Sequence, residues 1–358
     1  MKKILFIVMV LMVTALLMVG CTNQNSTITN NAKTAALSIY NWSTYIDPEI
    51  LSEFEKKFGV KIKYDTFESV DDLYAKLKPG NPGYDLIFPS DYMVTIMRKE
   101  GLLEKLNLAN IPNVKNLDSK FLNTPFDPGN QYSLPYQWGT MGLGYNLKAT
   151  GKELNSWEAI FDSKYRQRVA LMDELRSMLG AVLIYLGYDP NTTNPKEINQ
   201  AKDYLIKHRD TIAAFAPDTG QVLLDQGQVD VAVEWSGDIF QLMEENPNIR
   251  YAIPQEGSII WIDNIAIAKN APHKDTAEKF INFLFEPEIS AKISNFIKYG
   301  SPNKVAIEKG LIHESELKNP NIYPPPEILK KLTYIKDIGD ATRLYDEAWT
   351  EVKIGVGK

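Results

Sequence analysis

The sequence predicts an α/β fold of two lobes, each a mainly parallel sheet flanked by helices, with strands that join the lobes. Segments with strand and helix periodicity alternate along the chain, in two groups. Two long apolar segments accompany these groups and could cross between them. The chain has 358 residues, which exceeds the size at which a single hydrophobic core usually stops growing.

The first group begins with a strand over residues 37–42, and a helix follows it. Asp47 is placed as the N-cap of this helix, Pro48 as its first residue, and Gly59 as the glycine that ends it. The pattern then predicts a strand at 60–67, a helix at 70–77, a buried strand at 84–89 and a helix at 92–99. This β-α-β-α-β order is typical of a parallel sheet covered by helices.

The second group repeats this alternation, with predicted strands at 168–172 and 229–235 and helices at 196–208 and 220–226. Segments 132–145 and 249–268 resemble long strands that could run from one lobe into the other. Two crossings imply discontinuous domains and a strand hinge, about which the lobes can rotate as rigid bodies. We therefore expect the first lobe at residues 36–138 and 263–307, and the second at 139–262 and 308–358.

The N-terminus has the pattern of an export signal. Lys2 and Lys3 precede an apolar run at 4–19, and Cys21, the one cysteine of the chain, follows LMVG in a segment that resembles the bacterial lipobox. The run is short for a membrane-spanning helix, which is the alternative. We expect a lipoprotein signal peptide at 1–20, lipidation of Cys21 and a polar flexible tether at 21–35. The protein would then be periplasmic or otherwise extracytoplasmic and lipid-anchored to the membrane.

Aromatic residues gather at the predicted ends of strands or their turns, and carboxylates accompany several of them. An ammonium group is attracted to an aromatic face and pairs with a carboxylate, while methylene groups pack between rings. Open parallel sheets bind ligands beyond the carboxyl ends of their strands. The pattern therefore favours a site for a cationic alkylamine. The residues concerned are Trp42, Tyr45, Tyr92, Trp235, Trp261 and Tyr299, with Asp91, Asp238 and Asp263.

Several of these residues also have a structural interpretation. Trp42 fits packing and binding equally well, because large rings are usually buried in any case. Asp238 is better explained as the cap of a helix beginning near residue 239, although a cap carboxylate can also face a ligand. Glu174 or the preceding acid could start a helix. Trp138 and Trp349 lack the strand-end context and are assigned to packing or to the hinge.

Charge and composition argue against several other functions. The formal net charge is −6 and becomes −8 without the two signal lysines, which disfavours nucleic acid as a partner. The histidines are His208, His273 and His313, and they are too far apart in sequence to suggest a metal centre. No glycine-rich phosphate loop or free cysteine nucleophile is found. We therefore expect no enzyme activity, no cofactor and no metal.

Six ordered motifs resemble those of the extracytoplasmic spermidine/putrescine-binding receptors of polyamine ABC importers. The likeness covers nearly the whole mature chain, through SIYNW at 38–42, YDLIFPS at 84–90, FDP at 126–128, SLPYQWG at 133–139, INFL at 281–284 and GSPN at 300–303. The resemblance implies a type II periplasmic-binding-protein fold that works as a monomer. It also implies that a polyamine lies in the interlobe cleft and is delivered to the permease subunits of an ABC transporter.

The resemblance implies a binding site in which aromatic residues form the walls and acidic residues contact the ammonium ends of the ligand. Nine positions match residues that line the family's site, namely Trp42, Ser43, Tyr45, Ser90, Tyr92, Trp235, Trp261, Asp263 and Tyr299. Glu174 and Asp238 complete the predicted set of ligand-binding residues.

Three positions depart from the spermidine-type pattern. Ser177 stands where a second carboxylate would follow Glu174, Ile335 aligns with a glutamine, and Pro217 aligns with a serine of the cleft. In contrast, Asp238 lies in a segment similar to the Trp-x-Gly-Asp of putrescine-type receptors. The preference between putrescine and spermidine therefore stays open.

Two other functions remain as alternatives. A polyamine sensor that signals through a membrane partner would have the same sequence features, and neighbouring genes for a permease and an ATPase would distinguish it from a transport receptor. An enzyme acting on amines would need a redox cofactor or a nucleophile, and the sequence shows neither.

Overall fold

The computed structural model describes residues 35–354, and ten strands within this range form one sheet, eight of them in the order β2-β1-β3-β9-β4-β7-β5-β6. The other two pair beside this path, β10 with β9 and β8 with β4. The predicted signal peptide, Cys21 and all but the last residue of the predicted tether lie outside the described residues. Residues from Ala35 onward form one compact unit, so the predicted lobe boundaries stay predictions.

The first half of the fold has the predicted β-α-β-α-β order. Asp47 accepts a hydrogen bond from the Glu49 N–H (2.9 Å), and Gly59 ends the first helix with φ 65°. β1 pairs in parallel with both β2 and β3. β3 is shorter than the predicted strand at 84–89. The elements are β1 (Ala35–Trp42), α2 (Pro48–Phe58), β2 (Val60–Phe67), α3 (Val70–Leu77), β3 (Leu86–Ile87) and α4 (Asp91–Lys99).

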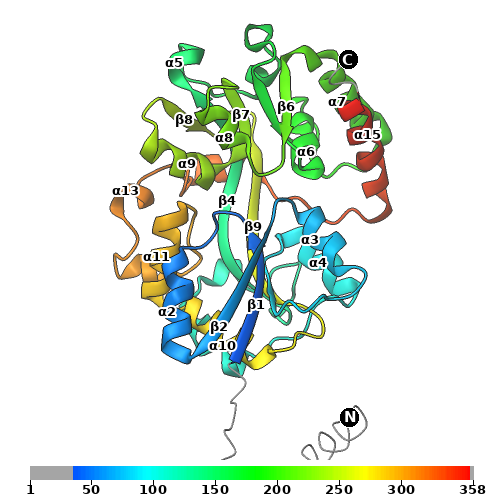
Figure 1. Cartoon of the computed structure of the whole chain (residues 1–358). Coiled ribbons are helices and arrows are strands. Elements are labelled where there is room, and N and C mark those ends of the chain that lie inside the picture. The colour runs from blue at the N-terminus through cyan, green and yellow to red at the C-terminus, as the bar shows by residue number, and fades with distance from the viewer. Residues whose placement is uncertain (1–34, 355–358) are drawn as a thin grey trace, which may run out of the picture. The chain divides into compact units, whose positions relative to one another are not determined.

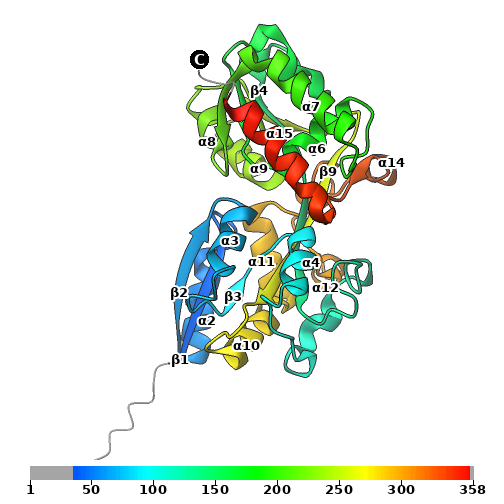
Figure 2. The same cartoon turned by 90° about the vertical axis from the view of Figure 1, so that its right-hand side faces the viewer.

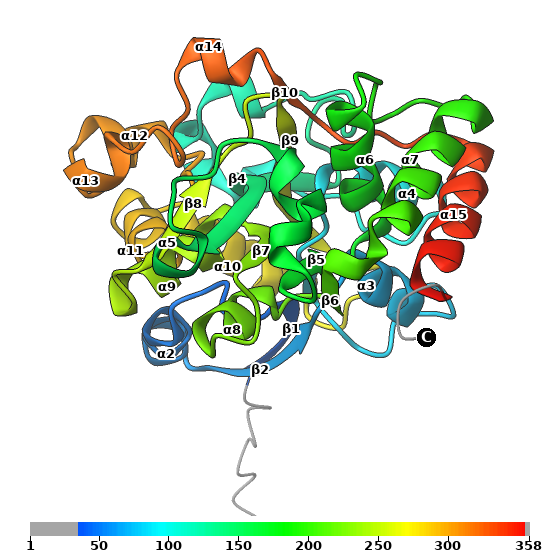
Figure 3. The same ribbon diagram turned by 90° about the horizontal axis from the view of Figure 1, so that it is seen from above.

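The second half is built around three parallel strands, with β5 between β6 and β7. One of them, β6, was not expected from the sequence. Figure 3 shows α6, α7 and α15 on one side of these strands and α8 and α9 on the other. The elements are β5 (Val169–Met172), α6 (Leu175–Tyr185), α7 (Pro195–Lys207), β6 (Ile212–Ala216), α8 (Gly220–Asp225), β7 (Val231–Trp235), α9 (Ser236–Glu245) and α15 (Thr342–Ile354).

The remaining elements belong to both halves, since β8 pairs with the part of β4 that also pairs with β7, whereas α11 is joined to α2 of the first half by an ion pair. Within residues 35–354, no helix combines the length and the apolar character that crossing a membrane requires. These elements are α5 (Leu147–Thr150), β8 (Ile249–Ala252), α10 (Lys274–Leu284), α11 (Pro287–Ile297), α12 (Lys304–Glu308), α13 (Glu314–Leu317), α14 (Pro326–Leu329) and β10 (Leu332–Thr333).

Two long antiparallel strands, β4 (Ser133–Asn146) and β9 (Ser258–Ile267), run between the two halves (Figures 1 and 2). β4 pairs with β9 along its first part and with β7 and β8 along its second part. The predicted strand at 132–145 is therefore confirmed. The prediction of one strand at 249–268 is wrong, because a turn that contains Pro254 and Gly257 (φ 114°) separates β8 from β9.

A bulge interrupts the pairing of β4 with β9 between Pro135 and Gln137, opposite Asp263. Proline has no N–H to give to a strand ladder, and bulges are common where a ladder loses one. Tyr136 is the residue left without a partner in the register, and its hydroxyl donates to the backbone oxygen of Tyr45 (2.8 Å). The bulge thus links a crossing strand to the loop after β1.

The two tryptophans assigned to packing or hinge do pack in the interior. Trp138 lies on β4 and contacts the rings of Phe121 and Tyr323. Trp349, on α15, packs edge-on against Phe215, and its indole N–H donates to Asp173 (2.9 Å). Neither tryptophan lines the cavity described below.

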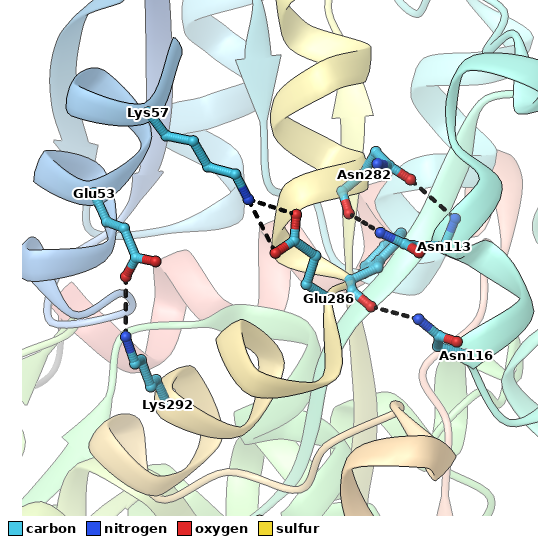
Figure 4. A network of polar contacts seen from close by, with 8 residues as sticks. Glu53, Lys57, Asn113, Asn116, Asn282, Glu286 and Lys292 are labelled. Carbon is cyan, nitrogen blue, oxygen red and sulfur yellow. Dashed lines mark hydrogen bonds and ion pairs between the residues drawn. The ribbon is translucent and has the colours of Figure 1, made fainter.

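A polar network anchors α10 and α11 against α2 (Figure 4). Lys57 pairs with Glu286 (2.9 Å), and Lys292 pairs with Glu53 (2.9 Å). Amide contacts extend the network through Asn113, Asn116 and Asn282. Tyr299 lies two residues after the end of α11. Anchoring α11 therefore helps to hold the Tyr299 ring in place.

A buried carboxylate at the start of β4 explains the FDP motif. Asp127 is fully buried and accepts backbone N–H groups from Gln131 (3.2 Å), Tyr132 (2.9 Å) and Ser133 (2.8 Å), as well as the Ser133 hydroxyl (3.0 Å). Several otherwise unpaired donors therefore depend on one side chain. This interaction holds the turn that leads into the first crossing strand.

We predict that Asp127→Ala lowers the free energy of unfolding by about 3 kcal/mol, because it leaves several buried donors unpaired. Urea unfolding followed by circular dichroism measures this loss. Asp118→Ala is the matched control, because Asp118 is half-buried, and its side chain accepts one backbone N–H, that of Lys120 (3.0 Å), and makes an exposed ion pair with the Lys120 ammonium (3.5 Å). That variant should lose about 1 kcal/mol, and equal losses in the two variants would contradict the assignment.

Candidate ligand-binding cavity

A cavity lies where the loops after β1, β3 and β7 meet β9, and it contains about 580 Å³ of empty space, including its open mouth. All eleven residues of the predicted binding set line it, although they come from distant parts of the chain. They are Trp42, Ser43, Tyr45, Ser90, Tyr92, Glu174, Trp235, Asp238, Trp261, Asp263 and Tyr299.

Four aromatic rings form a continuous group along this cavity. Trp261 stands near the middle, with ring centroids 5.8 Å from Trp235, 5.0 Å from Tyr299 and 6.5 Å from Tyr45. Tyr45 and Tyr299 meet edge to face at 5.5 Å. Edge-to-face contacts of this kind hold the rings in fixed orientations, so the aromatic wall is preorganised.

Two glycines make room for these rings. A Cβ on Gly139 would lie 2.7 Å from Trp261 Cζ2 and 2.8 Å from Tyr299 Cδ1. On Gly237 it would lie 2.4 Å from Tyr299 Cε2. Real Cβ atoms do not approach so closely, so the WSGD and YQWG segments need glycine at these positions for packing reasons.

Two expectations about the aromatic residues are corrected by the structure. Trp261 lies inside the crossing strand β9 rather than at a strand end, and it reaches the cavity because this strand passes beside it. Tyr299 follows helix α11, not a strand. Trp42 both packs and lines the cavity. Its ring lies 4.6 Å from that of Phe67, and its indole N–H donates to the Phe88 oxygen (3.0 Å).

The cavity wall is acidic and has no basic side chain. Five carboxylates line it, and none of the described residues along this wall is lysine or arginine. The residues are Asp91, Glu174, Asp218, Asp238 and Asp263. All five are less than a tenth exposed. An ionised carboxylate in such a place is poorly solvated and needs a cationic partner or a proton.

Burial shifts the titration of four of these acids. It raises the pKa of Asp238 to about 6 and that of Asp91 to about 7, although hydrogen bonds to both carboxylates counteract it. Burial and the neighbouring Asp238 charge raise the pKa of Asp218 well above its usual range. Burial, with a contribution from Asp91, also raises the pKa of Asp263. The empty cavity therefore disfavours full ionisation of its own wall.

The structure corrects the helix-cap interpretation of Asp238. Helix α9 begins at Ser236, so Asp238 lies in its first turn rather than at its cap. Its two carboxylate oxygens accept hydrogen bonds from the hydroxyls of Thr44 (3.1 Å) and Tyr299 (2.6 Å). The carboxylate is thus directed toward the cavity and the opposite half of the fold.

Glu174 combines the two roles that the sequence left open. It is the N-cap of α6, where one oxygen accepts the Ser177 N–H (2.8 Å). The other oxygen accepts the Tyr92 hydroxyl (3.2 Å). A cap carboxylate therefore also faces the cavity.

Three polar groups in the wall are buried without a hydrogen-bond partner among the described residues. They are the Tyr45 hydroxyl, the Ser90 hydroxyl and the indole N–H of Trp261. The Tyr45 hydroxyl is near enough to Asp263 to counteract part of the rise that burial causes in the pKa of that acid, but their geometry is not that of a hydrogen bond. Buried polar groups are nearly always paired in folded proteins, so these three indicate that a polar guest belongs in the cavity.

Hydrogen bonds cross the cavity between the two halves of the fold. Ser43 and Thr44 follow β1 and donate to Asp218 and Asp238, which belong to the second half. The Tyr92–Glu174 contact, described above, joins the halves in the same way. The acids of the second half are thus in contact with hydroxyls of the first.

Some lining residues were not predicted from the sequence. Asp218 follows the unexpected strand β6, and the only sequence signal was its neighbour Pro217, which aligns with a cleft serine. Asp91 was noted only as a neighbour of Tyr92. Ser177 and Ile335, two of the departures from the spermidine pattern, do line the cavity.

A sequence model of the family described as bacterial extracellular solute-binding protein matches residues 49–321. The chain belongs to this family. Its described residues form a mixed α/β fold with a mainly parallel sheet flanked by helices, and the acidic and aromatic cavity lies between the two halves of this fold.

Two relatives of this solute-binding protein have names that state a ligand. The spermidine/putrescine-binding periplasmic protein of Salmonella typhimurium is 37% identical over 321 residues, which cover 89% of this chain and 92% of the relative. The putrescine-binding periplasmic protein SpuD of Pseudomonas aeruginosa is 37% identical over 344 residues, covering 90% and 93% respectively.

Solved structures agree with the fold. The spermidine/putrescine ABC transporter substrate-binding protein PotD of Streptococcus pneumoniae, in complex with calcium and HEPES, has a TM-score of 0.76 and 35% identity, with 90% of this chain and 99% of that chain covered. The TpPotD lipoprotein of Treponema pallidum has a TM-score of 0.78 and 30% identity, covering 88% and 99%.

The raised pKa of Asp238 predicts a pH-dependent stability of the empty protein. The folded state holds the proton more tightly than the unfolded state, whose aspartates titrate near 3.8, so this contribution to stability is lost as the pH rises from about 4 through 6. Asp238→Asn keeps an acceptor for Tyr299 and removes the charge. It should stabilise the empty protein by up to about 3 kcal/mol at pH 7.5 and hardly at pH 4.

Urea unfolding at the two pH values, without amines, measures this difference. Asp210→Asn is the control, because Asp210 is exposed and does not line the cavity. An effect of Asp238→Asn that is equal at both pH values would contradict the prediction.

Proposed function

We propose that this protein binds a polyamine, putrescine or spermidine, in the cavity between its two halves and delivers it to an ABC permease for import. The observation that carries the proposal is the wall itself, where five buried carboxylates lie among aromatic rings with no basic side chain among the described lining residues. A flexible chain with an ammonium group at each end and methylenes between matches both features. The names of the relatives support the same ligand class.

The physical magnitudes are sufficient for such a role. Two charge-assisted contacts contribute about 1.5–3 kcal/mol each. A cation–π contact adds about 0.5–2 kcal/mol, and each buried methylene adds about 0.8 kcal/mol. After the cost of association, micromolar or tighter affinity remains. The desolvation of an ammonium group requires a carboxylate partner, so the acids rather than the rings determine whether a ligand binds.

The predicted binding set enters this proposal residue by residue. Trp42, Tyr45, Trp235, Trp261 and Tyr299 supply the aromatic walls. Hydroxyls and carboxylates bind the nitrogen atoms, with Asp263 on the crossing strand and Asp238 and Glu174 on the second half. The remaining members are Ser43, Ser90 and Tyr92. The preferred amine stays open, because Ser177 and Ile335 remove polar groups while Asp238 and Asp218 supply acid.

Binding would be coupled to closure of the two lobes. An amine held by Asp263 on one side and by Asp238 on the other favours the arrangement in which both contacts exist. The hydroxyl–carboxylate contacts from Ser43, Thr44 and Tyr92 would form in the same closed arrangement. The closed protein is the form that we propose docks on the permease.

The cellular setting of the proposal is extracytoplasmic. We propose that the signal peptide at 1–20 is removed and that the lipid on Cys21 keeps the monomer near its permease, through the tether. The name of a similar protein, the TpPotD lipoprotein, supports such an anchor. The proposed role is binding and delivery, without catalysis and without a cofactor.

Calorimetric titration of the soluble form, starting after Cys21, tests the proposal with putrescine and spermidine at matched ionic strength. We expect micromolar or tighter binding of at least one of them. Absence of binding heat from both amines, for a protein that unfolds cooperatively, would reject a polyamine ligand. Import of labelled amine into cells with and without the gene then distinguishes transport from sensing.

Asp263 and Tyr92 should differ in their importance for binding. Asp263→Asn removes the charge that compensates a buried ammonium and should weaken amine affinity by about tenfold or more. Tyr92→Phe removes only a hydroxyl that donates to Glu174 and should cost less. Titration of both variants with the better amine measures the ranking, and comparable losses would refute it.

A further inference from the structure

A pair of carboxylates lies at the second-half end of the cavity. Asp218 follows β6, and Asp238 lies in the first turn of α9. Together with Glu234 they bring carboxylate oxygens within 4.8 Å of one another, and all three residues are less than a tenth exposed. Asp218 was not part of the predicted binding set.

Glu234 differs from the other two because its oxygens are used by the backbone. One accepts the Gly220 N–H (2.8 Å) and the other the Trp235 N–H (3.0 Å). Glu234 does not line the cavity, whereas Asp218 and Asp238 do. Its role is to hold the first residue of α8, and with it the loop that carries Asp218, in place beside Asp238. Two carboxylates therefore face the ligand space here.

Side by side, these two acids repel each other when both are ionised. Asp238 and Glu234 lie beside Asp218, Glu68 and Asp263 add negative charge, and the Ser43 hydroxyl donates to Asp218. The described residues that line the cavity include no basic side chain that would relieve the repulsion. A single cation placed between the two carboxylates would relieve it. The Coulomb attraction is strong in a site that excludes most water.

Independent groups indicate what kind of cation fits. Tyr45 (5% exposed) and Trp261 (7% exposed) line the same cavity, and the Tyr45 hydroxyl and the Trp261 indole N–H are buried without a hydrogen-bond partner among the described residues. An indole N–H cannot ligate a metal, and aromatic rings attract organic cations. The hydroxyls of Thr44 and Tyr299 already donate to Asp238. These neighbours favour an organic ammonium over a metal ion.

We propose that Asp218 and Asp238 form one subsite, in which the N–H groups of a single terminal primary ammonium bridge both carboxylates. The inference rests on the proposed function and adds to it a specificity-determining residue, Asp218. A primary ammonium has three N–H donors, so it can serve two acceptors at once. A protonated secondary amine has two N–H donors and carries a methylene on each side, so it brings fewer donors and more apolar bulk to a pair of buried carboxylates. The subsite thus selects the end of a polyamine.

The test is calorimetric titration with putrescine at pH 7 in two buffers that differ in ionisation enthalpy. Asp218→Asn should weaken putrescine binding by about tenfold or more. In the unchanged protein, the acid pair holds a proton that passes to the buffer when the ammonium binds. Asp218→Asn should therefore lower the number of protons released on binding by roughly one. A residue with only a structural role would not change proton release.

Two matched variants make the result specific. Asp210→Asn removes an exposed carboxylate of the same half of the fold and should change neither affinity nor proton release. Ser43→Ala removes the hydroxyl that donates to Asp218 and should cost less affinity than Asp218→Asn. If Ser43→Ala costs as much, Asp218 acts only through Ser43, and the inference is overturned. Putrescine binding by Asp218→Asn that equals the unchanged protein overturns it as well.

Folding and metal binding are checked in parallel. The empty Asp218→Asn protein should unfold at an equal or higher temperature than the unchanged protein, because the repulsion from Asp238 is removed. If it does not fold, Asp218→Ser is titrated instead, with the same expected losses. Binding of Ca²⁺ alone, competed by putrescine, would identify a metal site and overturn the ammonium subsite. If the unchanged protein binds neither putrescine nor spermidine, the proposed function fails first, and this inference fails with it.

Discussion

The structure depends on the burial of acidic groups that have no basic partner among residues 35–354. Five carboxylates line one cavity, and their burial raises the pKa of Asp91, Asp218, Asp238 and Asp263. Proteins normally pair such groups internally, because an isolated buried charge is costly. Here the described partners are hydroxyl groups and backbone N–H groups, which stabilise the ionised form only in part. The fold therefore retains an unfavourable arrangement that a cation from outside can relieve.

The crossing strands explain how these acids come to face one another. β4 pairs with β9 in one half and with β7 in the other, so both halves are built on the same strand. The bulge at Pro135 and Gln137 lies opposite Asp263, and Trp261 lies two residues before it on β9. The connection between the halves is thus also part of the cavity wall. Under the proposed function, a ligand in this cavity would contact the strands about which the halves would move.

Local sequence patterns were most reliable where local chemistry decides the structure. The cap at Asp47, the left-handed glycine at 59 and the two helices that follow β1 and β2 were predicted with nearly their observed bounds. Predictions failed where an element depends on its neighbours. The segment IAAFA of β6 is a strand because β5 pairs with it, and the turn at 254–257 interrupts a segment that is otherwise apolar. The position of Asp218 at a strand end could not be found without β6.

The sequence by itself determined the α/β alternation, the candidate aromatic and acidic residues, and the resemblance that joined them into one binding set. Only the tertiary structure decided how each acid is used. Glu234 and Asp218 are both buried carboxylates near Asp238, yet the first accepts backbone N–H groups and the second lines the cavity. Helix capping and strand periodicity arise from residues close together in the chain. Desolvation and the pairing of charges depend instead on residues far apart, and these meet only in the folded protein.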